Sequence, residues 1–261
     1  MKPRLSILMC ALESRALRSY PLRQEILRQI EECSGMVEFR SLFDNGTIPS
    51  GRKRNQLVRE STGQYFCFLD DDDFISPDYV QLLCDGCDGY VQVVSLEMLR
   101  IDIDHGNARS HTFSIYHEDK KALSRGRWEM TANHLCAWRR DIGTKVAFPD
   151  HLGYADDVFW YRPLMESGLV TSEHHIDRTI YFYLWGGAAS VNQQPQLRQA
   201  TAKWQGGGIE CFRKGSEIFI ATECIEKSGN EAAVECRDKT GRVVTLDRRT
   251  LNRFSVVKVS V

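Results

Sequence analysis

The chain has 261 residues, of which 42% are hydrophobic and 26% are charged, as in an ordinary globular protein with one large domain and a small appendage. The formal net charge of -1 gives no electrostatic reason to expect a polyanion or an anionic membrane as partner. No stretch approaches about 18 uninterrupted apolar residues, and charge interrupts the N-terminal apolar run too early for a signal peptide. We therefore expect a cytoplasmic protein without a membrane span.

The first part of the chain alternates between strand and helix patterns. The alternation predicts an α/β sandwich, with a mostly parallel sheet and helices on both of its faces. In such sheets, ligands bind beyond the carboxyl ends of the strands. In chain order we expect a strand at 4–12, a helix at 20–35, a strand at 36–43, a Gly/Pro loop at 44–51, a helix at 52–62 and a strand at 64–70.

The remaining patterns are weaker and change character toward the C-terminus. Pro77 begins a helix, strand candidates follow at 89–99 and 111–117, and the polar segment 102–127 has no clear pattern. Apolar residues return at 134–142, a helix is expected at 155–168 and an aromatic strand at 178–185. From about Gly206, short alternating runs predict a small antiparallel β module, closed or nearly closed into a barrel. We predict a main domain at 1–204 and a β-barrel-like accessory module at 205–261.

The nine cysteines stand mostly in apolar surroundings, which predicts reduced core thiols. Cys84 and Cys87 have the CxxC spacing of a zinc or redox motif. No second pair at metal-site spacing follows, so we interpret them as two ordinary thiols near a turn.

Four consecutive aspartates, Asp70 to Asp73, follow the expected strand at 64–70. Neighbouring carboxylates raise one another's pKa unless a cation lies among them. Mg²⁺ and Mn²⁺ take oxygen ligands and are often held by one or two carboxylates, with phosphate oxygens completing the shell. The aspartates therefore indicate either a divalent metal site or a solvated acidic loop.

Residues 44–80 resemble the family 2 inverting glycosyltransferases, which have the Rossmann-like GT-A fold. The family has an aspartate after its second strand, a Ser/Gly-x-x-Arg-Asn helix start, a small-Gly-x-Tyr step, and Leu-Asp-x-Asp-Asp followed by a proline. A lone Asp-x-Asp would be weak evidence, whereas this ordered series is specific. The matching residues are Asp44, Ser50-Gly51, Arg54-Asn55, Thr62-Gly63-Gln64-Tyr65, Leu69-Asp70-Asp71-Asp72-Asp73 and Pro77.

The resemblance implies that Asp70 and Asp72 bind Mn²⁺ or Mg²⁺, with Asp72 as the direct ligand and the metal bridging the diphosphate of a nucleotide-sugar donor such as a UDP-sugar. It also implies that Arg15 and Asp44 hold the nucleotide base, and Asp73 is expected to cap the next turn. The amides at the start of the helix at 52–62 suit a diphosphate. The implied donor-binding residues are Ala11, Arg15, Asp44, Arg54, Asp70 and Asp71.

Residues 134–168 are similar to the acceptor region of the same family. There a Glu-Asp pair opens a helix, an aromatic residue follows the Asp by four positions and an Arg follows it by six. Counting back from Trp160 and from Arg162 leads to Asp156, which is our candidate general base, with Asp157 as the second candidate.

The sequence departs from the family pattern in two places. Ala155 stands where the family has the Glu, and glycines 186 and 187 stand where a His often helps to hold the metal or the diphosphate. We assign no third protein ligand, because a lone histidine is more often a hydrogen-bonded structural residue. The histidines left out of the metal set for this reason are His134, His174 and His175.

The predicted function is metal-dependent transfer of a sugar, with inversion, from a nucleotide-diphosphate donor to a hydroxyl of a glycan or a modified nucleic acid. One alternative makes the acceptor a hydroxymethylated base in viral DNA, with Arg248, Arg249 and Arg253 contacting phosphates. A second alternative is a non-catalytic nucleotide-sugar-binding protein. A haloacid-dehalogenase-type phosphatase is disfavoured, because its Asp-x-Asp lies near the domain start with a Thr or Val shortly after.

Overall fold

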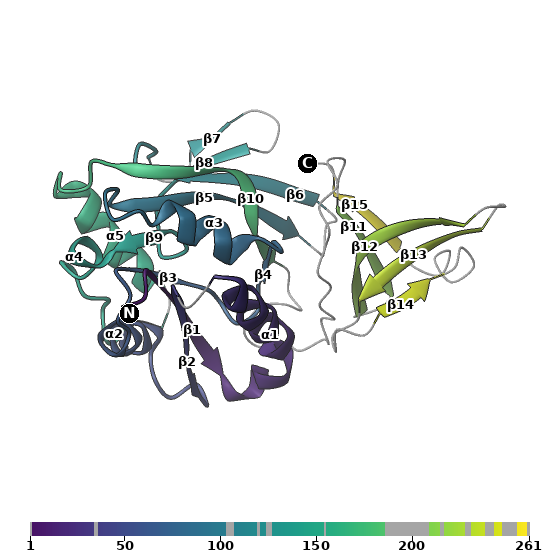
Figure 1. Ribbon diagram of the computed structural model, residues 1–261, viewed down its shortest axis with the longest axis horizontal. Coiled ribbons are helices and arrows are strands. Elements are labelled where there is room, and N and C mark those ends of the chain that lie inside the picture. The colour runs from purple at the N-terminus through teal and green to yellow at the C-terminus, as the bar shows by residue number, and fades with distance from the viewer. Residues whose placement is uncertain are drawn as a thin grey trace.

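The computed structural model describes residues 2–33, 36–102, 107–118, 121–123, 127–153 and 155–185, together with the backbone of five strands between residues 209 and 259. These residues form a ten-stranded mixed sheet and a separate five-stranded sheet (Figure 1). In the described part of the chain, no helix has both the length and the apolar character needed to cross a bilayer.

Three parallel strands form the part of the large sheet that leads to the aspartates. Strand β1 (Leu5–Leu12) pairs in parallel with β2 (Val37–Asp44) on one side and with β3 (Tyr65–Phe68) on the other. All three strands lie close to their predicted positions, because β1 and β3 are short apolar runs and β2 is a mixed apolar and polar run that ends at the Gly/Pro loop. Their carboxyl ends meet at one edge of the sheet, and the aspartates begin two residues beyond β3.

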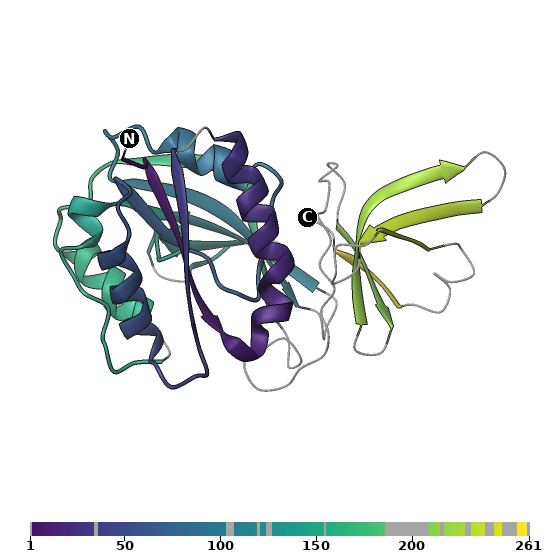
Figure 2. The same cartoon turned by 60° about the horizontal axis from the view of Figure 1, so that its bottom comes forward.

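Helices cover both faces of these strands, as Figure 2 shows for α1 (Ala16–Glu32) and α2 (Ser50–Glu60) on opposite sides of β1 and β2. Helix α1 begins four residues before its predicted start and contains Pro21. Leu22 and Ile26 of α1 are buried. The predicted α/β sandwich is therefore confirmed.

The second half of the large sheet is built around β5 (Val93–Asp102), which pairs in parallel with β10 (Glu173–Trp185). Strand β9 (Ala137–Arg139) runs antiparallel to both β3 and β5 and so joins the two halves. Several shorter elements did not stand out in the sequence, because two to five residues carry too little periodicity. The remaining elements are β4 (Phe74–Ile75), α3 (Tyr79–Gly86), β6 (Asn107–Ser114), β7 (Lys121–Ala122), β8 (Arg127–Thr131), α4 (Arg140–Gly143) and α5 (Asp156–Glu166).

An aromatic cluster fixes α5 against the sheet. The ring of Trp160 stacks on Phe148 with centroids 4.6 Å apart and meets Trp138 edge-on at 5.1 Å. The indole N–H of Trp160 donates to the carbonyl of Gly143 at 2.9 Å. Because Trp160 is fully buried, it holds the start of α5, with its two aspartates, at a defined position.

The second sheet consists of five antiparallel strands, which confirms the antiparallel module. Among the described strands, β14 and β15 stand at the two ends of the strand order, so closure into a barrel stays a prediction. The predicted boundary at 204/205 lies outside the described residues. In spatial order the strands are β14 (Val243–Leu246), β13 (Glu231–Arg237), β12 (Glu217–Lys227), β11 (Ile209–Lys214) and β15 (Ser255–Val259).

The cysteines of the described residues are free thiols, and most of them are buried. Cys84 and Cys87 lie in the core with no exposed surface, as expected for ordinary thiols beside a turn.

Candidate functional site

The candidate site lies at the carboxyl edge of β1, β2 and β3, where the chain brings carboxylates and cations together. The predicted residues form three groups of contacts, centred on Arg15, on Arg54 and on Lys53. Most of the site residues named from the sequence take part in one of these groups, and Asp157 contacts His134 instead. The residues in the three groups are Ala11, Arg15, Asp44, Arg54, Asp70, Asp71, Asp72 and Asp156.

Arg15 lies between two of the four aspartates. Its Nη1 is 2.7 Å from Oδ1 of Asp71 and 2.9 Å from Oδ2 of Asp72. The second oxygen of Asp71 accepts a hydrogen bond from the backbone N–H of Leu12, 3.0 Å away. This guanidinium thus supplies part of the positive charge that a row of carboxylates needs. The predicted contact of Arg15 with the nucleotide base stays a prediction.

Burial and mutual repulsion raise the pKa of the last two aspartates of the turn, Asp72 and Asp73. Burial raises the pKa of Asp72 to about 6, and the charges of Asp71 and Asp70 add to this, while Arg15 opposes it. Burial also raises the pKa of Asp73 well above its ordinary value, with Asp72 and Asp70 adding to the effect. Neighbouring carboxylates therefore raise one another's pKa here, as expected from the four consecutive aspartates in the sequence.

Asp73 connects the aspartate turn to β10. Its Oδ2 accepts from the hydroxyl of Tyr181 at 2.6 Å, and its Oδ1 lies 3.4 Å from the N–H of Leu184. The hydroxyl of Tyr181 in turn accepts from the backbone N–H of Asp70 at 3.3 Å. The carboxylate predicted to cap the next turn thereby anchors the turn to the opposite half of the sheet.

Arg54 and His134 connect Asp70 with the start of α5. The guanidinium of Arg54 is 3.0 Å from Asp156 and 3.6 Å from Asp70. Nδ1 of His134 is 2.9 Å from Oδ2 of Asp157, and its Nε2 is 3.7 Å from Asp70, an ion-pair distance that exceeds a hydrogen bond. Two cationic side chains thus bridge the aspartate turn and the helix that carries the candidate base.

These contacts set the ionisation of the carboxylates. Burial raises the pKa of Asp70, but His134 and Arg54 outweigh this effect and bring it below its ordinary value. Burial also raises the pKa of Asp157, but the charge and the hydrogen bond of His134 outweigh this and bring it below its ordinary value. Burial and Arg54 lower the pKa of His134, yet Asp157 and Asp70 raise it above its usual range. The geometry therefore favours an imidazolium between two carboxylates.

The two aspartates of α5 differ in accessibility. Asp156 is only 3% exposed, and its oxygens are engaged by the hydroxyl of Ser50 at 2.9 Å and by Arg54. The side chain of Asp157 is 19% exposed and bonds to His134. Ala155 precedes them in the left-handed region, with φ 58°. Of the two, Asp157 is the carboxylate that an acceptor can reach in this conformation.

Lys53 was not in the predicted set, although it joins two residues that were. Its Nζ is 2.5 Å from Oδ1 of Asp44 and 3.2 Å from the carbonyl of Ala11. The other oxygen of Asp44 accepts from the N–H groups of Gly46 and Ile48. Burial raises the pKa of Asp44, and Lys53 and these amides lower it to a net value below its ordinary range.

Sequence patterns carry a signal for Lys53 but none for His134 or Tyr181. Lys53 lies on the same buried stripe of α2 as Leu57, four residues on, and a lysine on such a stripe requires a buried anion. The histidine and the tyrosine reach Asp70 from sequence separations of more than sixty residues, and no local pattern reports such a contact.

A hard divalent cation fits this donor set. The side chains of Asp70 and Asp72 are 39% and 20% exposed, so each offers carboxylate oxygen toward solvent. The cationic side chains beside these two carboxylates are Arg54 and His134 at Asp70, and Arg15 at Asp72. Glycines 186 and 187 lie outside the described residues.

One family model matches part of the chain. Residues 47–159 match the model of Glycosyl transferase family 2. Among solved structures, residues 1–349 of S. aureus TarS are 14% identical with a TM-score of 0.45, covering 70% of this chain and 60% of that one. The structure of the same fragment with UDP-GlcNAc is 12% identical with a TM-score of 0.42, covering 71% and 59%. The chain thus spans less than two thirds of these structures, and no curated protein matches it.

Proposed function

Because residues 47–159 match the model of Glycosyl transferase family 2, we propose that the chain is a family 2-like glycosyltransferase with the GT-A fold. In this proposal it transfers a sugar from a nucleoside-diphosphate donor to a hydroxyl acceptor, with inversion at the anomeric carbon. One observation carries the proposal. Asp70, in the position of a metal and diphosphate ligand, and Asp157, in the position of a base, lie on either side of His134 at the carboxyl edge of the sheet.

Donor binding falls to the residues at the ends of β1 and β3. Asp70 and Asp72 would hold Mn²⁺ or Mg²⁺, and the bound ion would supply Lewis acidity toward the departing diphosphate. Arg15 and Arg54 add positive charge where the leaving phosphate becomes more negative. The arginines are already held in place by Asp71 and Asp156, so little reorganisation is needed at the moment of reaction.

The acceptor hydroxyl loses its proton as it attacks the anomeric carbon, and Asp157 receives it. His134 donates to Oδ2 of Asp157 and so directs the other oxygen toward the acceptor. This assignment reverses the order expected from sequence, in which Asp156 came first. The reason is accessibility, since Asp156 is buried and bonded to both Ser50 and Arg54.

A panel of nucleotide sugars tests the proposal through melting temperature and product release, each with and without Mn²⁺. We expect one donor to stabilise the protein strongly and only with metal. Asp72→Asn should abolish that response while the ligand-free melting temperature holds or rises, because the raised pKa of Asp72 marks an unfavourable charge. Asp85→Asn, an equal change on the exposed part of α3, is the control. A panel in which no donor stabilises or reacts would contradict the proposal.

A cluster of arginine and tryptophan supports the alternative in which the acceptor is a modified nucleic acid. Arg100 lies over the ring of Trp185 at 4.2 Å and Arg109 over Trp128 at 5.9 Å. Tyr183 lies opposite Arg100 in the ladder between β10 and β5, and the N–H of the next residue, Leu184, lies 3.4 Å from Oδ1 of Asp73, so the cluster borders the aspartate turn. Cations interleaved with aromatic rings are what grooves for single-stranded nucleic acid present.

A further inference from the structure

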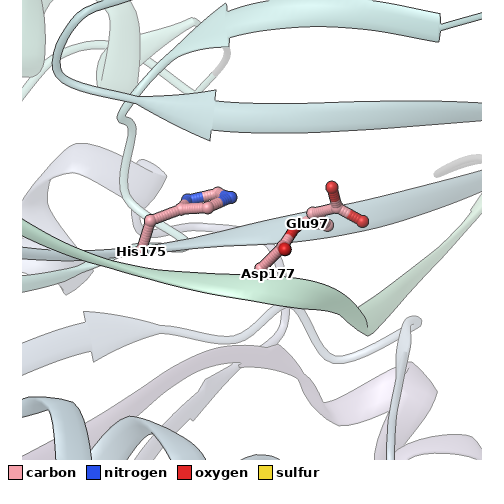
Figure 3. Close-up of side chains that lie close together, drawn as sticks. All are labelled: Glu97, His175 and Asp177. Atoms are coloured by element: carbon pink, nitrogen blue, oxygen red, sulfur yellow. The ribbon is translucent and has the colours of Figure 1, made fainter.

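Two neighbouring strands carry a second group of metal-ligating side chains, away from the aspartate turn. Glu97 is on β5, and His175 and Asp177 are on β10 (Figure 3). One ligand atom from each of the three lies within 4.8 Å of the others. In the described part of the chain this is the only such group of three His, Cys, Asp or Glu residues.

A β-bulge produces this arrangement. The register of β10 on β5 passes from Ile176 opposite Leu96 directly to Thr179 opposite Glu97. Asp177 therefore belongs to extra residues that have no partner on β5, and the bulge places it beside Glu97. Bulges of this kind redirect a side chain and are common beside functional sites.

The hydrogen bonds around the group hold two of its members in a ligating pose. Nδ1 of His175 is 2.9 Å from the hydroxyl of Ser95 on the neighbouring strand, which leaves Nε2 for another partner. The hydroxyl of Thr112 donates to Oε1 of Glu97 at 3.5 Å. Metal-ligating histidines and carboxylates regularly have such outer partners, because these fix the ring and the lone pairs.

The charges also favour a cation. Glu97 and Asp177 bring two carboxylates together, with one oxygen of each within 4.8 Å of the other. Asp177 is exposed and the other two are half-buried, so the group is open to ions from solvent. A dication would offset the repulsion between the two carboxylates.

We propose that Glu97, His175 and Asp177 form a binding site for a divalent transition-metal ion of the Zn²⁺ type, with water in the fourth position. The imidazole nitrogen favours Zn²⁺ over Mg²⁺, which prefers oxygen ligands alone. The site is distinct from Asp70 and Asp72 and independent of the proposed transfer reaction. Bound metal would link the bulge of β10 to β5. Tyr181 lies farther along β10.

The test is a titration of the full chain with Co²⁺ and Zn²⁺ in an Asp72→Asn background, which removes the metal ligand proposed at the aspartate turn. We expect bound Co²⁺ to show a visible absorption band typical of nitrogen and oxygen ligands. This band should disappear when Zn²⁺ displaces the Co²⁺. Binding at cysteines would be recognised by thiolate charge-transfer bands in the near ultraviolet. Zn²⁺ should also raise the melting temperature.

Three substitutions and one control decide the assignment. Ser95→Ala should weaken Zn²⁺ binding about 10–100-fold, and His175→Ala and Glu97→Gln should weaken it more. His174→Ala should leave it unchanged, because the ring of His174 lies beside Gly86 of α3, apart from the group. The proposal would be overturned if the protein showed no saturable Zn²⁺ binding, or if Glu97→Gln and His175→Ala bound Zn²⁺ as tightly as the wild type. It would also be overturned if His174→Ala lost as much Zn²⁺ affinity as His175→Ala.

Discussion

Asp156 and Asp157 are neighbours in the chain, yet the side chains around them differ in kind. Asp156 is buried and holds Arg54, which stacks against the rings of Phe68 and Phe148. Asp157 is partly exposed and bonded to His134. Two identical neighbouring residues therefore differ in burial and in partner, and on this difference we base the proposal that Asp157 is the base.

Substitution of each aspartate by asparagine separates these parts. Asp157→Asn should lower kcat by roughly 10²–10⁴ while donor affinity and stability stay near wild type. Asp156→Asn should reduce the free energy of unfolding by about 1–3 kcal/mol, because a hydrogen-bonded buried charge pair is broken. Steady-state kinetics and urea unfolding measure the two effects. The opposite pattern would return the role of base to Asp156.

At the scale of elements, one carboxylate of β2 ties three segments together. Glu38 accepts hydrogen bonds from the hydroxyl of Ser6 on β1 and from the N–H groups of Thr62 and Gly63, which precede β3. A Cβ at Gly63 would lie 2.4 Å from Oγ of Ser6, which explains the glycine of the small-Gly-x-Tyr step. The three strands that end at the site are thus held in register at their beginnings.

The ionisation of Glu38 should be visible in the stability of the fold. Burial raises its pKa, but the N–H of Thr62, Ser6 and Arg40 outweigh this and hold it at about 2. The folded pKa lies below the unfolded one, so this stability is present above about pH 4 and is lost as the pH falls toward 2.

We therefore expect Glu38→Gln to lower the free energy of unfolding by about 1–3 kcal/mol at pH 7 and by less near pH 2. Urea unfolding across this pH range is the measurement. Glu60→Gln, on the exposed end of α2, should have little effect and serves as the control. A loss that is the same at pH 7 and pH 2 would show that the charge of Glu38 contributes nothing.

At the scale of the whole molecule, the candidate site and the second sheet are made by separate parts of the chain. Every contact described for the site comes from residues before Trp185, and strands β11 to β15 form ladders only with one another among the described strands. Removal of residues 206–261 should therefore preserve metal-dependent donor binding and slow hydrolysis of the nucleotide sugar, and should reduce transfer to the acceptor.

The salt dependence of acceptor binding distinguishes the acceptor classes. If the acceptor is DNA with hydroxymethylated bases, binding should weaken steeply between low and physiological salt, and Arg100→Ala should weaken it further. Arg28→Ala, an exposed change on α1, is the control. A glycan acceptor should show little dependence on salt. Absence of DNA binding even at low salt would eliminate the nucleic-acid alternative.

In the truncation experiment, loss of donor binding would contradict the separation of the candidate site from the second sheet.

Sequence alone determined the parallel strands β1, β2 and β3, the helices between them, the aspartate turn and the antiparallel character of the C-terminal strands. These features depend on periodicity and on motifs whose residues lie close together in the chain. The resemblance to the family 2 glycosyltransferases followed from the same local order, because the motif residues succeed one another at fixed spacing, and residues 47–159 match that family's model.

Only the tertiary structure decided which partner each carboxylate has. His134, in the turn between β8 and β9, contacts Asp157 of α5, and Tyr181 of β10 contacts Asp70. The bulge that brings Glu97 and Asp177 together depends on the register between two strands far apart in the chain. Neither register nor long-range packing leaves a periodic trace in the sequence. The accessibility of Asp157 relative to Asp156 therefore became visible only when the burial of each side chain was known.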